Sequence, residues 1–313
     1  MNDFLEDVAR AARDQDSLVL VLPTPRACLF FDLRYRELFG QGAEFAVKDW
    51  ETFLAPLSSL RAVDAPALVF ELYKQYPGDQ KPDLDLFYTW AEVIVNDFSE
   101  ADANLVEADA LFADVDQWQR YADPPSAYLD QADDYRRFWE ILGKEAKEMK
   151  KKFVESWGTL HQLYHNFRSA LEKLGWGYYG MRVRDVCRKI AEGKITPERP
   201  HWFAGFSRLS KGEAKIMRAF IGQTGQWIYD GDKYFALNDY HDAGLGYRRA
   251  ERLIGRTTPF WAHDAQEKHI ESVGAPLRFG QAAALGQYLS ELDETTVWER
   301  VAVVLPDDAS LEA

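Results

Sequence analysis

The chain has 313 residues, and its 51 Asp and Glu outnumber its 37 Lys and Arg, which gives a formal net charge of −14. Phosphate binding is driven by Lys and Arg that displace condensed counterions, so this acid excess excludes a protein whose whole surface binds nucleic acid. Hydrophobic residues make up 47% of the chain and aromatics 14%. The chain is therefore no disordered polyelectrolyte, and its length predicts about two domains.

Cysteine usage and hydropathy predict the compartment. Cys28 and Cys187 are the only cysteines, too few for a disulfide framework, which favours a reducing environment. No apolar run approaches the ~20 residues that span a bilayer, and the charged N-terminal stretch has no signal-peptide core. We expect a cytoplasmic protein with no membrane partner.

The charge is concentrated in one part of the chain. Residues 63–134 carry 3 Lys and Arg against 17 Asp and Glu, a net charge of −14, whereas residues 135–199 carry 15 against 8, a net charge of +7. We call these the acidic segment and the basic segment. The net charge of the whole chain therefore does not exclude a basic surface that binds nucleic acid on an otherwise acidic protein.

The first predicted element is a buried strand. Residues 18–22 (LVLVL) form an apolar run that ends at Pro23, as in a strand covered on both faces of a parallel sheet. A helix follows from about Pro25, because proline suits the first helical turn and ACLFFDLRYREL repeats apolar residues at helical spacing.

Helical periodicity dominates from about 66 to 194, and strand-like runs return at 200–206, 225–232 and 298–306. The simplest account is an α/β domain built from both ends of the sequence around a large helical insertion. The chain stops at Ala313, where a helix should cover the last strand. We therefore expect it to be a fragment of a longer protein.

No phosphate loop is present: neither GxxxxGK[ST] nor GxGxxG occurs in the sequence. Without the glycines and the lysine of such a loop, the sequence shows no motif that can bind and polarise the triphosphate of ATP, so we do not expect ATP hydrolysis. We predict no cofactor and no catalytic residue in this segment. A nucleotide-binding enzyme with an atypical phosphate loop remains an alternative.

Two patterns bear on metal binding. His161 and His165 stand four apart on a helix, where two imidazoles can share a metal, but Gln162 replaces the Glu that a zincin needs. The pattern favours a polar pair in an aromatic helix. Asp230-Gly231-Asp232 follows a predicted strand, where the carboxylates can either bind a divalent ion or cap the next segment from a turn. We favour the capping turn, because Asp and Gly are typical turn residues. No metal site is predicted.

The basic segment interleaves cations with aromatic residues, a pattern typical of single-strand binding surfaces. Aromatics at helical spacing are also core residues, and the basic segment can instead pair with the acidic one. The cations are Lys144, Lys147, Lys150, Lys151, Lys152, Arg168, Lys173, Arg182, Arg184, Arg188 and Lys189.

Four segments, in chain order, match motifs that occur together in one protein family. LVLVLPTPRACLFFDLRYREL matches a strand-Pro-x-x-Arg segment. A helical block "F-x-x-W … D-F-x-x-x-D" is matched by Trp90, Asp97, Phe98 and Asp102. A block "W-x-x-L-x-x-L-Y-x-x-F … L-x-x-x-G … Y-x-G-M-x-x-R" is matched by Trp157, Leu160, Leu163, Tyr164, Phe167, Leu171, Gly175, Tyr179, Gly180, Met181 and Arg184. A segment "F-x-G-F-x-x-L-S-x-x-E" is matched by Gly205, Phe206, Leu209, Ser210 and Glu213. Together these segments resemble AddB-type proteins, the helicase-like, nuclease-bearing subunits of bacterial DNA-end-processing complexes.

The resemblance implies a RecA-like (P-loop NTPase-like) α/β fold of the UvrD/RecB helicase-like superfamily that has lost its motor. Gly205-Phe206 stand where an active helicase has its Walker B acids, and the Walker A lysine is absent. The family's PD-(D/E)XK nuclease motif belongs to a C-terminal region not present here. Nuclease activity is thus expected only of a longer parent, and this segment is expected to be no enzyme.

The resemblance also implies a domain division. Residues 1–62 and 196–275 are expected to form the RecA-like domain, 63–195 the helical insertion, and 276–313 the start of a second helicase-like domain. The implied function is a non-catalytic scaffold in double-strand-break repair and recombination, which binds a DNA single strand or duplex end, or an AddA-like motor subunit. A protein-interaction module without DNA contact is the alternative.

Eight residues are predicted to contact DNA. Four lie where strands end, since polar groups beyond the carboxyl ends of parallel strands face a ligand crevice: Thr24, Arg26, Ser207 and Arg208. The other four are predicted backbone contacts on the basic segment: Lys150, Lys151, Lys152 and Arg184.

Overall fold

The computed structural model describes residues 4–15, 17–78, 81–111, 143–255, 257–261, 270–293, 295–298 and 301–305. For residues 143–158, and for 86, 89, 260 and 261, it describes the backbone alone. The chain divides into two compact units, Met1–His263 and Asp264–Ala313. No helix in the described ranges is long and apolar enough to cross a membrane.

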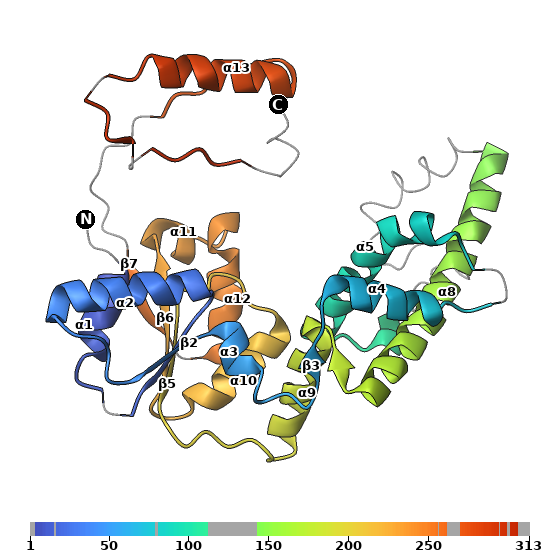
Figure 1. Ribbon diagram of the computed structural model, residues 1–313, viewed down its shortest axis with the longest axis horizontal. Helices are drawn as coiled ribbons and strands as arrows, with labels where there is room; N and C mark the ends of the chain where they lie inside the picture. The colour runs from blue at the N-terminus through green and yellow to red at the C-terminus, as the bar shows by residue number, and fades with distance from the viewer. Residues whose placement is uncertain are drawn as a thin grey trace. The chain divides into compact units, whose positions relative to one another are not determined.

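A five-stranded parallel sheet forms the centre of the first unit (Figure 1). In chain order its strands are β1 (Val19–Leu22), β2 (Ala46–Asp49), β5 (His201–Ala204), β6 (Gln226–Gly231) and β7 (Thr258–Trp261). They lie in the order β2-β1-β5-β6-β7. The α/β class and the strands predicted at 18–22, 200–206 and 225–232 are confirmed, whereas β2 and β7 were not predicted.

Helices cover both faces of this sheet, as Figure 1 shows. Alternate residues of β1 point to opposite faces, as the two-residue period of a strand requires. Leu18, Leu20 and Leu22 pack with α1 (Phe4–Ala12) and α2 (Pro25–Phe39). Val19 and Val21 belong to the core on the other face. That core includes side chains of α3 (Trp50–Leu54), α9 (Tyr179–Ala191), α10 (Lys211–Ile221) and α12 (Leu245–Ile254).

The described residues between β2 and β5, which leave out 79–80 and 112–142, are mostly helical. Their longer helices are α4 (Ala65–Lys74), α5 (Leu84–Ala103), α8 (Gly143–Leu174) and α9. A second apolar core joins α4, α5, α8 and the start of α9, and a two-stranded sheet of β3 (Arg61–Ala62) and β4 (Trp176–Gly177) lies beside it. Because α9 contributes to both cores, it fastens these helices to the sheet.

Close backbone contact explains how α9 packs on α5. A Cβ atom added at Gly180 would lie 2.0 Å from the Ser99 carbonyl oxygen, and one at Gly212 would lie 2.6 Å from the Ala103 carbonyl oxygen. Only glycine fits at such distances, so both positions let neighbouring helices approach α5 closely.

The second unit contains α13 (Leu277–Ser290). Here one prediction is wrong: residues 301–305 are apolar but form no strand, and Val304 is 88% exposed. The helix expected after Pro306 lies outside the described residues.

Candidate functional site

Strand order identifies one edge of the sheet as a place for a ligand. From β1 the chain moves outward to β2, and it then returns beside β1 as β5 and continues outward on the other side. This is the doubly wound order in which ligands bind beyond the carboxyl ends of the strands where the direction reverses. The reversal falls between β1 and β5, and we call the edge beyond the carboxyl ends of β1, β5 and β6 the carboxyl edge.

Thr24 and Arg26 lie at this edge, where β1 leads directly into α2. Thr24 is the N-cap of α2: its Oγ1 accepts a hydrogen bond from the Ala27 backbone N–H at 3.1 Å, and its carbonyl oxygen accepts one from the Cys28 N–H at 3.2 Å. The Arg26 side chain is exposed. Thr24 thus has a structural task, and Arg26 is available to solvent.

The same loop offers little to a phosphate. Phosphate loops point several backbone N–H groups at the anion. Pro23 and Pro25 have no N–H to offer, and those of Ala27 and Cys28 already bond to Thr24. The end of β1 therefore has no cradle for a triphosphate.

Ser207 and Arg208 lie at the same edge, because β1 pairs in parallel with β5 from Val19↔His201 to Val21↔Phe203. Both residues are exposed. A Cβ atom at Gly246 of α12 would lie only 2.5 Å from the Ser207 carbonyl oxygen, so a helix backs this loop closely. The structure thus brings together the four strand-end residues that the sequence predicted.

Two further cations belong to the carboxyl edge. Lys211 is the first residue of α10, which follows β5, and Lys233 is the first residue of α11 (Lys233–Leu237), which follows β6. Both are exposed, and sequence analysis missed them because neither stands in a charge run. Among the described residues, none of the following four cations has an ion-pair partner: Arg26, Arg208, Lys211 and Lys233.

Exposed aromatic rings accompany the cations. Phe30 lies one helical turn after Arg26 on α2 and is 52% exposed, and Tyr234 follows Lys233 and is 64% exposed. Residues four apart lie on the same helix face. The carboxyl edge therefore offers both cations and flat apolar rings to solvent.

Three carboxylates at or near this edge, Asp49, Glu213 and Asp232, accept hydrogen bonds from the fold, whereas Asp230 at the end of β6 is exposed. Asp232 accepts the Tyr234 N–H at 2.8 Å and caps α11, which confirms the predicted capping role of this residue. Asp230 and Gly231 belong to β6 and not to a turn. Glu213 accepts the Ser210 N–H at 2.6 Å in a capping box and also the Tyr179 hydroxyl. Partial burial opposes ionisation of Asp49, but hydrogen bonds from Thr52 outweigh it and lower the Asp49 pKa. These three acids are bound to donors of the fold, whereas the cations are not.

Arg184 has a different place from the one predicted. Its Nε lies 2.8 Å from Asp102 Oδ1, its Nη2 donates to the Val106 carbonyl oxygen at 2.6 Å, and its side chain is 20% exposed. Asp102 is fully buried. Arg184 thus fastens α9 to α5 and does not belong to the carboxyl edge, because Asp102, Val106 and, at 3.7 Å, Glu107 engage its guanidinium. Its predicted DNA contact stays a prediction.

Three more side chains converge on Asp102. The hydroxyls of Tyr164 and Tyr178 donate to it at 2.7 and 2.6 Å, and Arg168 Nη1 lies 3.2 Å from Oδ1. Burial and then the Asp102 charge raise the pKa of Tyr164 to about 12 and that of Tyr178 well above its usual range, so both remain donors. The basic and acidic segments thus pair with each other here, as one of the two interpretations of the basic run predicts.

The remaining predicted contacts are Lys150, Lys151 and Lys152. Their backbone belongs to α8, while their side chains lie outside the described part of the structure. Their role stays a prediction.

Side chains suited to a metal ion converge elsewhere, where Asp109 meets His161 and His165 of α8. The sequence showed the histidine pair but gave no sign of the carboxylate, which comes from a distant part of the chain.

Comparisons of the sequence with models of known protein families and with curated proteins find no match.

Proposed function

We propose that the chain is a non-catalytic, helicase-like scaffold that binds single-stranded nucleic acid at the carboxyl edge of its sheet. The observation that carries the proposal is the set of four exposed cations without ion-pair partners among the described residues, placed beside two exposed rings. Lys and Arg bind the phosphate backbone, and aromatic rings stack with unpaired bases.

Spacing supports a shared ligand. Neighbouring strands lie about 4.8 Å apart, so the ends of β1 and β6 are about 10 Å from each other across β5. A strand of nucleic acid that crosses the carboxyl edge can therefore contact Arg26, Arg208 and Lys233 in turn.

The loop after β1 supports the non-catalytic part of the proposal, since it presents no phosphate cradle and no lysine of the Walker type. In this proposal the α/β unit is a RecA-like domain without its motor, with residues 63–195 as its helical insertion. We assign it, by the sequence resemblance, to a DNA-end-processing protein whose nuclease lies beyond this segment and whose motor is an AddA-like partner.

The test compares two charge reversals on one strand. Arg208 follows the carboxyl end of β5, and Arg199 is exposed just before its amino end. Fluorescence anisotropy with a labelled oligonucleotide of about 16 nucleotides measures binding by the full chain. We expect Arg208→Glu to weaken binding about tenfold or more and Arg199→Glu by less than about twofold, although both change the net charge equally.

Equal losses in both variants would mean that binding follows net charge alone, which overturns the carboxyl edge as the site. If the unaltered chain shows no salt-sensitive binding but captures a motor subunit, the interaction module replaces the proposal. A rise in Tm with Mg-ATP would overturn its non-catalytic part, and we expect none.

A further inference from the structure

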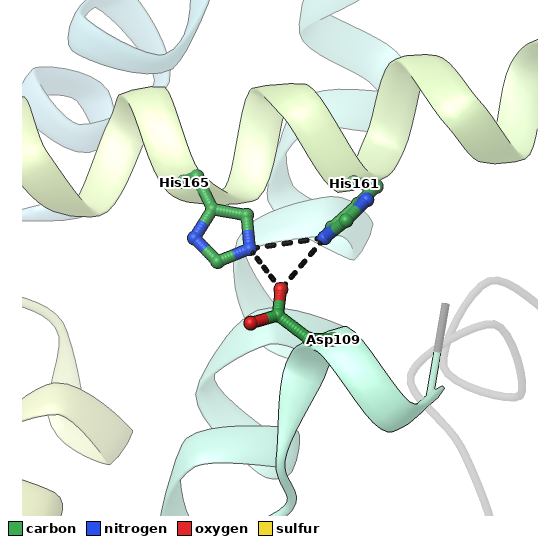
Figure 2. Close-up of side chains that lie close together, drawn as sticks. All are labelled: Asp109, His161 and His165. Atoms are coloured by element: carbon green, nitrogen blue, oxygen red, sulfur yellow. Dashed lines mark hydrogen bonds and ion pairs between the residues drawn. The ribbon is translucent and has the colours of Figure 1, made fainter. Parts of the chain in front are cut away.

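Three side chains converge on the exposed surface of α8 (Figure 2). Asp109 Oδ1 lies 2.9 Å from His161 Nε2 and 2.8 Å from His165 Nε2, and the two Nε2 atoms lie 3.0 Å from each other. Each residue therefore directs one lone-pair-bearing atom toward the same point.

The geometry matches that of a metal site. In a tetrahedral zinc site with bonds of about 2.0–2.1 Å, ligand atoms lie about 3.3 Å apart. The three observed separations are a few tenths of an ångström shorter, and exposed side chains can open by that amount. The His-x-x-x-His spacing on one helix face is the usual way for α-helices to present two imidazoles.

A hydrogen-bonded cluster explains the arrangement less well. If both imidazoles donate Nε2–H to the same carboxylate oxygen, two N–H groups also point toward one another at a 3.0 Å nitrogen–nitrogen separation. A cation bound by two imidazole lone pairs and one carboxylate removes that conflict.

Both sides of the cluster are held in place by the Asp102 network. On one side, His165 contacts the Tyr164 ring edge-on at 5.2 Å, and the Tyr164 hydroxyl bonds to Asp102. On the other side, the helical turn that carries Asp109 follows Val106, whose carbonyl oxygen accepts a hydrogen bond from Arg184. The helix that carries the histidines and the turn that carries Asp109 are thus both anchored to the Asp102 network, while the donor side chains themselves are exposed.

We propose that Asp109, His161 and His165 bind a divalent transition-metal ion of the zinc class, with water at the fourth position. Two imidazoles and one carboxylate select Zn²⁺ or Co²⁺ over Mg²⁺ and Ca²⁺, which prefer all-oxygen sites. Side-chain exposures of 39%, 48% and 80% give the ion access and leave room for the water. The bound ion ties the turn at 108–111 to α8, and so links the acidic segment to the basic one.

The test titrates the full, untagged chain with Co²⁺ and Zn²⁺. We expect one equivalent of Co²⁺ to give the visible absorption of a low-coordinate ion, and Zn²⁺ at 100 times its Kd to raise Tm by about 5 °C. Asp109→Asn and the double variant His161→Gln/His165→Gln should each weaken binding at least about 100-fold, more than the loss of a supporting group does. Asp97→Asn, on the exposed face of α5, is the matched control and should bind as the unaltered chain does.

Zinc-edge X-ray absorption of the unaltered chain tests the ligands without any substitution. Two imidazoles with oxygen ligands support the site, whereas sulfur in the coordination shell places the ion at a cysteine and overturns it. Binding by Asp109→Asn within about threefold of the unaltered chain overturns it as well.

Discussion

Replacing Asp102 with Asn should destabilise the protein severely, because this one carboxylate joins three helical elements. It is fully buried and has contacts with Arg168 and Tyr164 of α8 and Arg184 of α9. Asparagine has nearly the same shape but no charge, and its amide nitrogen would face a donor. The change therefore removes the buried counter-charge of two guanidinium groups, which keep only longer ion pairs to exposed acids, Arg168 with Glu172 at 3.6 Å and Arg184 with Glu107 at 3.7 Å.

The expected magnitude follows from how buried the partners are. Breaking a buried ion pair by removing one partner costs about 3–5 kcal/mol. Arg168 and Arg184 keep 24% and 20% of their side-chain exposure, so water replaces part of the lost interaction. We therefore expect a loss of about 2–4 kcal/mol in the free energy of unfolding, and a fall in Tm of roughly 5–10 °C for a unit of this size.

Urea denaturation followed by far-UV circular dichroism measures the loss. The control is Asp97→Asn, an exposed position on the same helix with the same chemical change, which should alter stability by less than about 0.5 kcal/mol. A double-mutant cycle with Tyr178→Phe should give a coupling energy of about 1 kcal/mol or more, since the hydroxyl lies 2.6 Å from Asp102 Oδ2. If Asp102→Asn costs less than about 1 kcal/mol, or the cycle shows no coupling, the network does not hold these elements together.

Three further predictions test packing, pH dependence and salt dependence. Gly180→Ala should cost about 1–3 kcal/mol in thermal denaturation, because its Cβ meets the Ser99 carbonyl oxygen at 2.0 Å; an unchanged Tm would contradict the close packing of α9 on α5. Burial opposes ionisation of Asp185, but bonds from the Ser59 N–H and Arg188 outweigh it and lower its pKa. Its contribution is thus fully present at neutral pH and is lost as pH falls from the ordinary aspartate range through the lowered pKa. Asp185→Asn should therefore be less stable than the unaltered chain at pH 7, and this difference should shrink as urea titrations move below about pH 4. Four phosphate contacts at the carboxyl edge predict a slope of about −3 for log K against log[salt] with single strands, and Arg26→Ala should reduce it to about −2; an unchanged slope would remove Arg26 from the interface.

Sequence patterns predicted the centre of the sheet better than its edges. The run that became β1 is apolar throughout, and β5 is apolar after His201, because helices cover both faces of these strands. Such runs are conspicuous in a sequence. The edge strands β2 and β7 have one neighbour each, so β2 carries Lys48 and Asp49 and β7 contains Pro259. Residues 301–305 show the reverse error, since an apolar run forms a strand only when another strand pairs with it.

The predicted DNA contacts differ in whether the fold gives the cation an ion-pair partner, and the sequence does not show this. Arg208 was predicted from its place beyond a strand end and Arg184 from the basic segment, and nothing in either pattern shows whether the cation is paired. Arg208 is exposed and has no ion-pair partner among the described residues, whereas Arg184 meets Asp102 across a helix interface. Net charge and spacing locate cations along a chain, but only the fold determines whether a carboxylate from a distant segment neutralises them.

Internal ion pairs also reduce the repulsion of nucleic acid that the acid excess of the chain predicts. The acidic segment holds a net charge equal to that of the whole chain, but part of it is used internally, because Asp102 pairs with two arginines. Long-range repulsion of nucleic acid by this segment is therefore weaker than its composition implies, since paired charges cancel beyond a few ångströms. A metal ion at Asp109 would reduce it further by adding two positive charges. If that is so, loading the chain with Zn²⁺ should strengthen single-strand binding at low salt, and the Asp109→Asn variant should show no such response to Zn²⁺.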